Sequence, residues 1–423
     1  MKRLVTAVAA VAATALALTG CSAAGSGSDP NNPNQLEAFT WWSSGSEKVG
    51  LDALVDTFAL QYPGIEFLNA SVAGGAGSNA KAALAARLEA DNPPDTFQAH
   101  AGAELTDYIE AGRLQDLTGF YADNGLDEVF PETLIERLTV DGKIYSVPSN
   151  IHRANVVWAN TQVLEDAGLD PTSPPATLDA WIDDMQTLQD AGVEYPLALG
   201  TDWTQLQLFE NVLIADLGPD QYSGLWTGAT NWNVLGVREA VTDYGRLLDF
   251  ANPDHSAMEW DKATQLVIDG DAAYNVMGDW AEAAFEQAGQ TYDNQYTTFP
   301  TPGTDGVFDF LADSFTLPVG APHEQAAKDW LTTISSADGQ KAFNLAKGSI
   351  PARTDANPSD YPPYQQTAMA SFANDTVVSS LAHGAAARIG WSAGISDAVA
   401  KFGEDRHADA LIKTLIQLQS DKG

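Results

Sequence analysis

Strand-like and helix-like segments alternate along the chain after residue 35, and this order constrains the fold more than any other feature. Short apolar runs predict strands at 36–40, 66–72 and 96–99. Apolar residues at helical spacing predict helices at 79–89 and 105–110, and an earlier one whose apolar face carries Leu51, Leu54, Val55, Phe58, Ala59 and Tyr62. This order predicts an α/β fold with a mainly parallel sheet that helices cover on both faces.

The same pattern restarts further along the chain. Strands are predicted at 144–147, 156–159, 196–199, 272–276, 296–299 and 314–317. Thr177 is placed to cap a helix that ends before Gly192, and Ala408, Leu411, Ile412, Leu415 and Ile416 mark a terminal helix. A folded body of about 390 residues exceeds what one hydrophobic core usually reaches, so we expect two α/β lobes.

The amino terminus predicts export and lipid attachment. Lys2 and Arg3 precede an apolar run at 4–18, which is the layout of a signal peptide and is short for a membrane span. The run ends in Leu18-Thr19-Gly20-Cys21, which resembles a bacterial lipoprotein processing box, and Cys21 is the only cysteine. We therefore expect a signal peptide at 1–20, a lipid on Cys21 and a flexible tether through residue 35, where no large apolar side chain occurs.

The charge balance excludes one class of partner. The chain has 21 Lys and Arg against 57 Asp and Glu, a net charge of −36 that signal removal would bring to −38. Nucleic acid binding requires cationic side chains that displace counterions, so we exclude nucleic acid as a partner. Most of the acidic residues are expected to solvate the exterior, and a cationic ligand is the less favoured interpretation.

The common enzyme signatures are absent or incomplete. The chain has no G-x-S-x-G and no G-x-x-x-x-G-K-[ST] sequence, and His323-Glu324 is followed by Ala327 where a zinc motif needs a second ligand. The segment 75–80 fits G-x-G-x-x-A, but the next predicted strand ends in His100 and not in an acid for a ribose. We expect no metal and no cofactor, and only a glycosidase with a carboxylate pair stays open.

Aromatic residues beside polar groups cluster where predicted strands end. Trp41-Trp42 follows the first strand, and Gln98 and His100 end the third. Gly278-Asp279-Trp280 follows a later strand, with Asp279 placed to cap the next helix; Asp313 precedes another strand, and His383 lies in a Gly/Ala-rich stretch. Indole rings pack on the C–H faces of a sugar, while Asp, Gln and neutral His bind its hydroxyls. Together these clusters favour a carbohydrate site.

These segments resemble the extracellular sugar-binding lipoproteins of bacterial ABC importers, most closely their glucose/mannose/galactose-type monosaccharide-binding branch. The resemblance runs in consistent order from about Leu36 to His383. It is carried by Trp41-Trp42, Gly74-Gly75-Ala76-Gly77, Pro93-Pro94-Asp95-Thr96-Phe97-Gln98-Ala99-His100, Asn150-Ile151-His152-Arg153, Asn275-Val276-Met277-Gly278-Asp279-Trp280-Ala281, Asp313-Ser314-Phe315, Lys347-Gly348-Ser349-Ile350 and His383-Gly384.

The resemblance implies a two-lobed periplasmic-binding-protein-like fold (type II) with the ligand cleft between the lobes. It implies three chain crossings, near 150–152, 307–313 and 348–353, with residues 36–150 and 313–349 in lobe 1 and 151–312 and 350–423 in lobe 2. It assigns to the sugar site Trp41, Trp42, Glu47, Gln98 and His100 from the first lobe, and Trp260, Asp279, Trp280, Asp313, Lys347 and His383 from the second lobe or the hinges.

The function implied is reversible binding of a neutral monosaccharide, glucose before mannose or galactose, and its delivery to ABC permease subunits without chemistry. The protein would be a monomer that the lipid on Cys21 anchors on the outer face of the cytoplasmic membrane. Three alternatives remain at this point: a di- or oligosaccharide receptor of the same class, a glycoside hydrolase, and a purely structural surface lipoprotein.

Overall fold

The computed structural model describes residues 28–73 and 77–420. The predicted signal peptide, the lipid attachment at Cys21, the start of the tether and Gly74–Ala76 lie outside the described residues. Within the described residues, no helix has both the length and the apolar character needed to cross a membrane.

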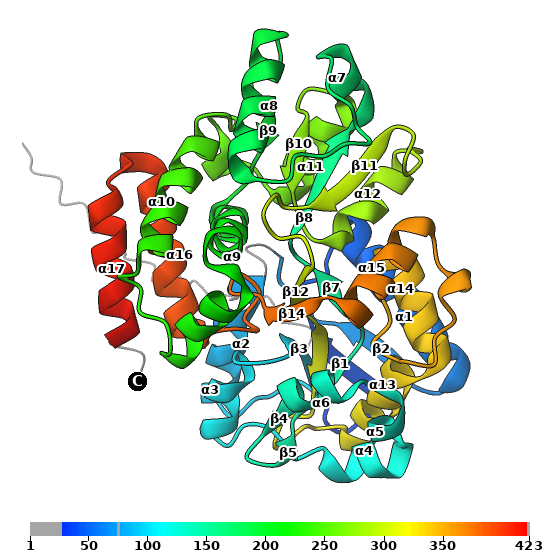
Figure 1. Cartoon of the computed structure of the whole chain (residues 1–423). Helices are drawn as coiled ribbons and strands as arrows, with labels where there is room; N and C mark the ends of the chain where they lie inside the picture. The colour runs from blue at the N-terminus through cyan, green and yellow to red at the C-terminus, as the bar shows by residue number, and fades with distance from the viewer. Residues whose placement is uncertain (1–27, 74–76, 421–423) are drawn as a thin grey trace, which may run out of the picture.

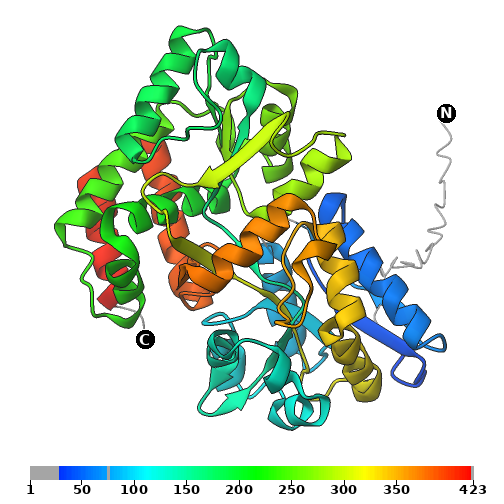
Figure 2. The ribbon, with the colours of Figure 1, turned by 45° about the vertical axis from the view of Figure 1, so that its right-hand side comes forward.

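The described chain forms two lobes joined at a central waist, where segments from several parts of the chain meet (Figures 1 and 2). The first lobe is built on a five-stranded sheet with the order β2-β1-β3-β13-β6. Its strands are β1 (Gln35–Phe39), β2 (Glu66–Asn69), β3 (Thr96–His100), β6 (Ser146–Pro148) and β13 (Asp313–Thr316). β1 is parallel to β2 and β3, whereas β13 runs antiparallel to β3 and β6.

The second lobe is built on a four-stranded sheet with the order β11-β8-β10-β9. Its strands are β8 (Val156–Asn160), β9 (Leu197–Ala198), β10 (Tyr274–Val276) and β11 (Tyr296–Pro300). β8 is antiparallel to β10 and β11, and β9 is parallel to β10. Both sheets are mixed, but in each of them a single strand, β13 in the first lobe and β8 in the second, runs against the others, so most strands are parallel as predicted. In the first lobe, β13 enters directly from the waist and so runs against the strands that end there.

Helices cover both sheets. In the first lobe they are α1 (Gly45–Gln61), α2 (Ser78–Glu89), α3 (Leu105–Glu110), α4 (Thr118–Asn124), α5 (Leu126–Val129), α6 (Glu132–Leu138), α13 (Glu324–Ser335) and α14 (Ala337–Lys347), with the hairpin β4 (Thr139–Val140) and β5 (Lys143–Ile144). In the second they are α7 (Thr161–Asp166), α8 (Leu178–Asp190), α9 (Asp202–Thr227), α10 (Leu235–Leu248), η2 (His255–Ala257), α11 (Trp260–Asp269), η3 (Asp279–Ala281), α12 (Glu282–Gln287), α16 (Ile389–Asp405) and α17 (Ala408–Ser420).

Several helices follow directly from their local sequence. Thr177 accepts a hydrogen bond from the Ala180 N–H (3.2 Å), so α8 begins where its cap predicts. In the first lobe, the Trp330 ring lies 4.9–5.5 Å from the rings of Phe58, Phe67 and Phe315, so α1, α13 and the sheet share one core. The strand predicted at 144–147 is wrong: residues 143–144 pair with β4 and residues 146–148 with β13.

A third sheet joins the lobes at the waist. It has the order β14-β12-β7 and consists of β7 (His152–Arg153), β12 (Val307–Leu311) and β14 (Thr376–Ser379). Beside it, Ile151 and Ile350 exchange backbone hydrogen bonds, and η4 (Pro358–Asp360) leads into α15 (Pro363–Asn374), which packs against β12. Chain segments that are distant in sequence thus run side by side at this hinge.

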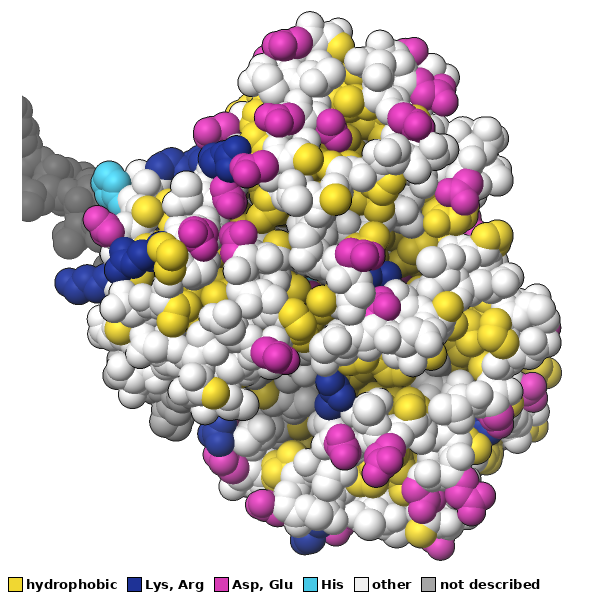
Figure 3. Space-filling model, viewed as in Figure 1, with side chains coloured by type: hydrophobic (Ala, Val, Ile, Leu, Met, Phe, Trp, Pro, Cys, Tyr) yellow, Lys and Arg dark blue, Asp and Glu magenta, His cyan; other side chains and the backbone are white. Residues whose placement is uncertain are grey.

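Acidic side chains are spread over both lobes on the face shown in Figure 3, with few basic side chains among them. This scatter is what surface solvation requires, and it forms no single acidic tract on that face.

Candidate ligand-binding cleft

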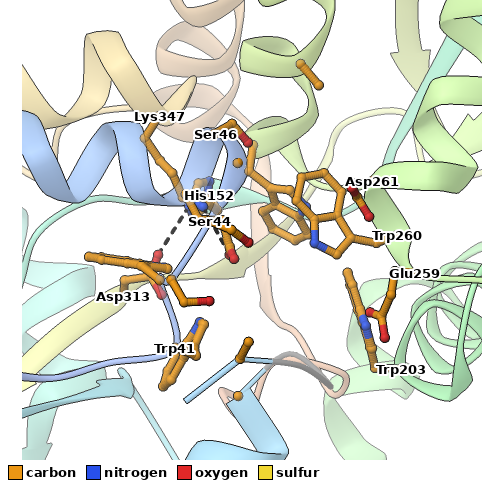
Figure 4. Close-up of a pocket in the computed structure, with 18 of the residues that line it drawn as sticks. Trp41, Ser44, Ser46, His152, Trp203, Glu259, Trp260, Asp261, Asp313 and Lys347 are labelled. Atoms are coloured by element: carbon orange, nitrogen blue, oxygen red, sulfur yellow. Dashed lines mark hydrogen bonds and ion pairs between the residues drawn. The ribbon is translucent and has the colours of Figure 1, made fainter. Parts of the chain in front are cut away.

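A cleft of about 920 Å³ lies between the two lobes (Figure 4). The first lobe contributes the residues that follow β1, together with His100, Asp313 and Lys347. The second lobe contributes Trp203, Trp280 and the start of α11, and the hinge contributes His152. β1 and β3 point their carboxyl ends at this cleft, which is where open α/β sheets commonly bind ligands.

Two tryptophans after β1 form the first-lobe wall. The Trp42 ring is fully buried, 5.8 Å from the Phe315 ring and 5.0 Å from the Phe343 ring. Trp41 is 7% exposed, and its ring fits against Gly77, where a Cβ atom would lie 2.8 Å from the indole. Because Gly77 also has a φ of +86°, this position suits glycine on both counts. Gly77, the second glycine of the G-x-G-x-x-A segment, therefore makes room for the Trp41 ring.

Three tryptophans line the second-lobe side. Trp203 lies in the first turn of α9, and its ring is 6.2 Å from the Trp280 ring, while Trp260 begins α11. A Cβ atom on Gly278 would lie 2.0 Å from the Trp280 ring, so only glycine leaves room for this indole. Figure 4 shows Trp203 and Trp260 on the side of the cleft opposite Trp41. The cleft thus has aromatic surfaces on both lobes.

A buried histidine joins two carboxylates at the hinge. His152 Nδ1 donates to Asp279 Oδ1, and His152 Nε2 lies 3.3 Å from Asp313 Oδ2. Burial alone would lower the pKa of His152, but the charges of Asp279 and Asp313 raise it above its ordinary value. Burial raises the pKa of Asp279 despite the opposing His152 charge. His152 Nε2 also lies 2.8 Å from the Asn150 Nδ2 donor, so one imidazole ring connects Asp279 with Asp313 and Asn150.

Asp313 is the acceptor at the base of the cleft. Its Oδ1 accepts from Gln98 Nε2 (2.9 Å) and its Oδ2 from Asn150 Nδ2 (3.0 Å). Burial would raise its pKa, but the hydrogen bond and the charge of His152, with the charge of His100, hold the pKa well below its usual range. Asp313 therefore presents an ionised carboxylate to the cleft.

A second acid in the cleft is paired with a lysine. Lys347 Nζ lies 3.4 Å from Glu47 Oε1 and 5.7 Å from the centre of the Trp42 ring. Burial raises the pKa of Glu47, and the Lys347 charge opposes this shift. Charges in the cleft are thus largely matched within the protein.

His383 offers a different polar group. Burial, followed by the charge of His100, lowers the pKa of His383 well below its ordinary value, so the ring is neutral. Within the described residues, four buried polar atoms of the cleft wall have no hydrogen-bond partner: Trp42 Nε1, Ser46 Oγ, Trp203 Nε1 and His383 Nε2. Buried polar atoms usually have partners, so these atoms are candidates to bind a ligand.

Most of the predicted site residues line this cleft: Trp41, Trp42, Glu47, His100, Trp260, Trp280, Asp313, Lys347 and His383. Gln98 and Asp279 lie behind the wall. Gln98 is held by Asp313 and by the Trp41 N–H, and Asp279 by His152 and the Arg153 N–H. The carboxylate of Asp279 therefore does not cap a helix, because the hinge backbone and His152 occupy both of its oxygens.

The sequence interpretation missed Trp203 and did not place His152 in the site. Trp203 follows β9 across a short loop, so it fits the same pattern as Trp41, an aromatic residue shortly after the end of a strand. His152 is a polar residue in a two-residue strand and has no comparable local signal.

Metal ligation has no support among residues 28–73 and 77–420, where no group of three or more His, Cys, Asp or Glu could hold an ion. His323, from the incomplete zinc motif, instead bonds Asp95 Oδ2 (3.0 Å) through Nδ1 and the Asp29 carbonyl (3.1 Å) through Nε2.

Comparisons with known proteins agree on one family. Residues 42–341 match the family model of bacterial extracellular solute-binding proteins. An uncharacterized ABC transporter extracellular-binding protein of Pyrococcus horikoshii is 34% identical over 90% of this chain and 86% of its own length. A probable sugar-binding periplasmic protein of Mesorhizobium japonicum is 31% identical over 92% of this chain and 94% of its own length. Among solved structures, a chitin oligosaccharide binding protein superposes with a TM-score of 0.81 at 21% identity, over 92% of this chain and 98% of that chain, which shows a shared fold.

Proposed function

Because this chain belongs to the family of bacterial extracellular solute-binding proteins, we propose that it is the sugar receptor of an ABC importer. It is a binding protein with the two-lobed fold of periplasmic binding proteins, and not an enzyme. The sugar would bind in the interlobe cleft and leave unchanged for the permease.

One observation carries this proposal: the cleft places indole surfaces from both lobes around an ionised carboxylate and a neutral imidazole. Sugar rings pack their C–H faces on indoles, and their hydroxyls donate to carboxylates and to bare imidazole nitrogens. Closing the lobes on such a ligand would remove water, after which a missing hydroxyl would leave Asp313 or His383 unpaired. This is a basis for high specificity.

We assign a neutral hexose as the ligand, glucose before mannose or galactose. The acids and bases of the cleft support a neutral ligand, because Lys347 is matched by Glu47 and His152 by Asp279 and Asp313. The eleven residues predicted from the sequence remain our proposed site, with Gln98 and Asp279 acting through Asp313 and His152.

The proposed setting follows from the same family. ABC permease subunits would recognise the closed form, and the lipid on Cys21 would hold a monomer at the outer face of the membrane. We propose 36–150 and 313–349 as lobe 1 and 151–312 and 350–423 as lobe 2, in accord with the strands of the two sheets.

A thermal-shift screen with single sugars tests the proposal. A ligand that binds only the folded state stabilises it by about 2.7 kcal/mol at a concentration of 100 Kd, so glucose should raise Tm by several degrees. No shift with any mono- or disaccharide would favour a purely structural protein. Release of reducing sugar from an aryl glycoside would instead indicate a hydrolase.

An oligosaccharide receptor is the second candidate, because the cleft is large. Its volume of about 920 Å³ is near the upper end of the ~300–1,000 Å³ range for drug-sized ligands. A further hollow of about 660 Å³, which shares Trp203 with the cleft, lies between α2, α3, α9 and α16. A trisaccharide that binds at least ten times more tightly than glucose would favour this candidate.

A further inference from the structure

Glu210 lies behind the cleft and holds the loop that carries His383. It is fully buried on α9. Its Oε2 accepts from the backbone N–H groups of Leu381 (2.6 Å) and Ala382 (2.8 Å). Its Oε1 accepts from the hydroxyl of Ser380 (2.8 Å). The carboxylate is thus surrounded by donors from the residues immediately before His383.

Ser380 links this carboxylate to the imidazole. Its Oγ lies 2.8 Å from Glu210 Oε1 and 2.9 Å from His383 Nδ1. A hydroxyl has one proton to donate, and an ionised carboxylate can only accept. The Ser380 hydroxyl therefore donates to Glu210, and His383 Nδ1 must carry a proton and donate to Ser380. Since the ring is neutral, His383 Nε2 is then a bare acceptor at the cleft wall.

Asp309 holds the first proton of this carboxyl pair, which leaves Glu210 ionised above its own pKa of about 7. Asp309 lies on hinge strand β12, is fully buried, and its carboxyl faces that of Glu210. Among the described residues, neither Asp309 oxygen has a hydrogen-bond donor, whereas Glu210 receives three. Two adjacent buried carboxyls do not both ionise, so the proton stays on Asp309, which donates to Glu210.

We propose that Glu210 is a positioning residue for ligand binding. With the proton on Asp309, it fixes His383 as the Nδ1–H tautomer through Ser380, so that Nε2 accepts a hydrogen bond from a ligand hydroxyl. This inference rests on the proposed function for the hydroxyl ligand, but the tautomer itself is a property of the free protein.

The groups around His383 keep its ring neutral, so only the position of the ring proton can change. Arg153 and Tyr222 face the carboxyl pair, and the Tyr222 hydroxyl is occupied by the Ser379 carbonyl (3.1 Å). Burial is the largest cause that lowers the pKa of His383; the nearby His100, His152 and Lys81 lower it further, and Asp313 opposes them. Protonation of His383 near neutral pH is therefore disfavoured.

Two isosteric variants of the same pair should give opposite results. In Asp309→Asn, the new amide still donates to the Glu210 carboxylate, so His383 should remain Nδ1–H. In Glu210→Gln, the amide oxygen must face the N–H groups of Leu381 and Ala382, so its NH₂ donates to Ser380. The Ser380 hydroxyl then donates to His383 Nδ1, and the ring proton moves to Nε2.

The experiment is ¹⁵N NMR of the histidine rings of the free protein at pH 8.5, where Glu210 is ionised, with the His383 signal assigned by its loss in His383→Gln. The wild type and D309N should show Nδ1–H, and E210Q should show Nε2–H. Should E210Q fail to fold, Ser380→Ala should release the tautomer, giving a mixture with a substantial Nε2–H population. Nε2–H in the wild type, or an unchanged Nδ1–H signal in E210Q or S380A, would overturn the inference.

Titration of the same proteins with glucose separates the two proposals. We expect E210Q to bind at least about tenfold more weakly, because a donor replaces the acceptor at the cleft, and D309N to bind within about threefold of the wild type. The predicted tautomers without binding of any sugar would overturn the proposed function alone. The predicted tautomers with equal affinity in E210Q and D309N would overturn the role of His383 Nε2.

Discussion

Two pairs of buried carboxyls lie at the hinge, and the protein treats them in opposite ways. Asp279 and Asp313 are separated by the His152 ring, which bonds one and lies 3.3 Å from the other. Glu210 and Asp309 have no such ring between them, and the charge of Arg153 partly offsets the burial and repulsion that raise the pKa of Asp309. In the first pair the pKa of Asp313 is lowered, while in the second burial raises the pKa of Glu210 to about 7.

The difference shows that the location of a buried carboxyl, at the cleft or behind it, determines its role. The pair that shares the His152 ring ends at the cleft and presents the Asp313 carboxylate to the ligand. The pair that retains a proton lies behind the cleft and orients a backbone segment and a histidine. A buried ion needs either an opposite charge or several donors, and each pair supplies one of the two.

The largest expected effect is on the first pair. Asp313→Ala should weaken glucose binding about 10- to 100-fold in titration calorimetry, because a hydrogen bond to a charged acceptor contributes about 1.5–3 kcal/mol. Asp309→Asn, which also removes a hinge carboxyl, is the matched control and should change the affinity less than about threefold. Equal losses in the two variants would mean that the pairs do not differ in function.

The pH dependence of stability should distinguish the pairs next. A carboxyl whose folded pKa is raised contributes its stability fully below the unfolded pKa near 4.5 and loses it as pH rises to the folded value, about 7 for Glu210. His152, whose pKa is also raised, contributes in the same direction near and above pH 6.5. Urea unfolding at pH 5 and pH 7 should show a loss on the order of 1–2 kcal/mol in the wild type from the carboxyl pair. D309N should reduce this loss. The same loss in D309N and in the wild type would show that Glu210 and Asp309 do not share a proton.

Gly278, next to Asp279, gives a smaller expected effect. Its φ of −67° suits alanine, so Gly278→Ala acts only through the Cβ that would meet the Trp280 ring at 2.0 Å. Displacing this indole should weaken sugar binding roughly 3- to 10-fold, in line with the ~0.5–1.5 kcal/mol of an aromatic contact. Gly119→Ala is the control, since nothing lies near its Cβ position, and should leave affinity unchanged. Wild-type affinity in G278A would exclude Trp280 from the binding surface.

The smallest effect is expected outside the hinge. Arg388 on the second lobe pairs with Glu110 on the first, but these side chains are 37% and 58% exposed. Exposed ion pairs contribute about 0–1 kcal/mol, so Arg388→Ala should change glucose affinity less than about twofold. A larger change, with an unchanged Tm, would show that an exposed pair controls lobe closure as strongly as the buried ones.

Local sequence patterns predicted the elements whose structure depends mainly on neighbouring residues. The apolar run before Trp41 predicted β1, and the capped periodic segment after Thr177 predicted α8. The tryptophans at strand ends led to the cleft for the same reason, since their position depends on the strand before them.

The hinge could not be predicted in this way. β7 has only two residues, both polar, and it pairs with β12 from a distant part of the chain, so neither length nor alternation identifies it. The Glu210–Asp309 pair is equally hidden, because α9 and β12 meet only in the folded protein. The direction of β13 also depended on its entry from the hinge, and this reversed the expected parallel pairing.

Titration calorimetry with D-glucose measures directly whether this protein is a sugar receptor. We expect saturable heat at a stoichiometry of one sugar per chain, with this heat strongly reduced in D313A and retained in D309N. Absence of binding heat for glucose, mannose, galactose and a panel of di- and trisaccharides, with a protein that melts cooperatively, would contradict it.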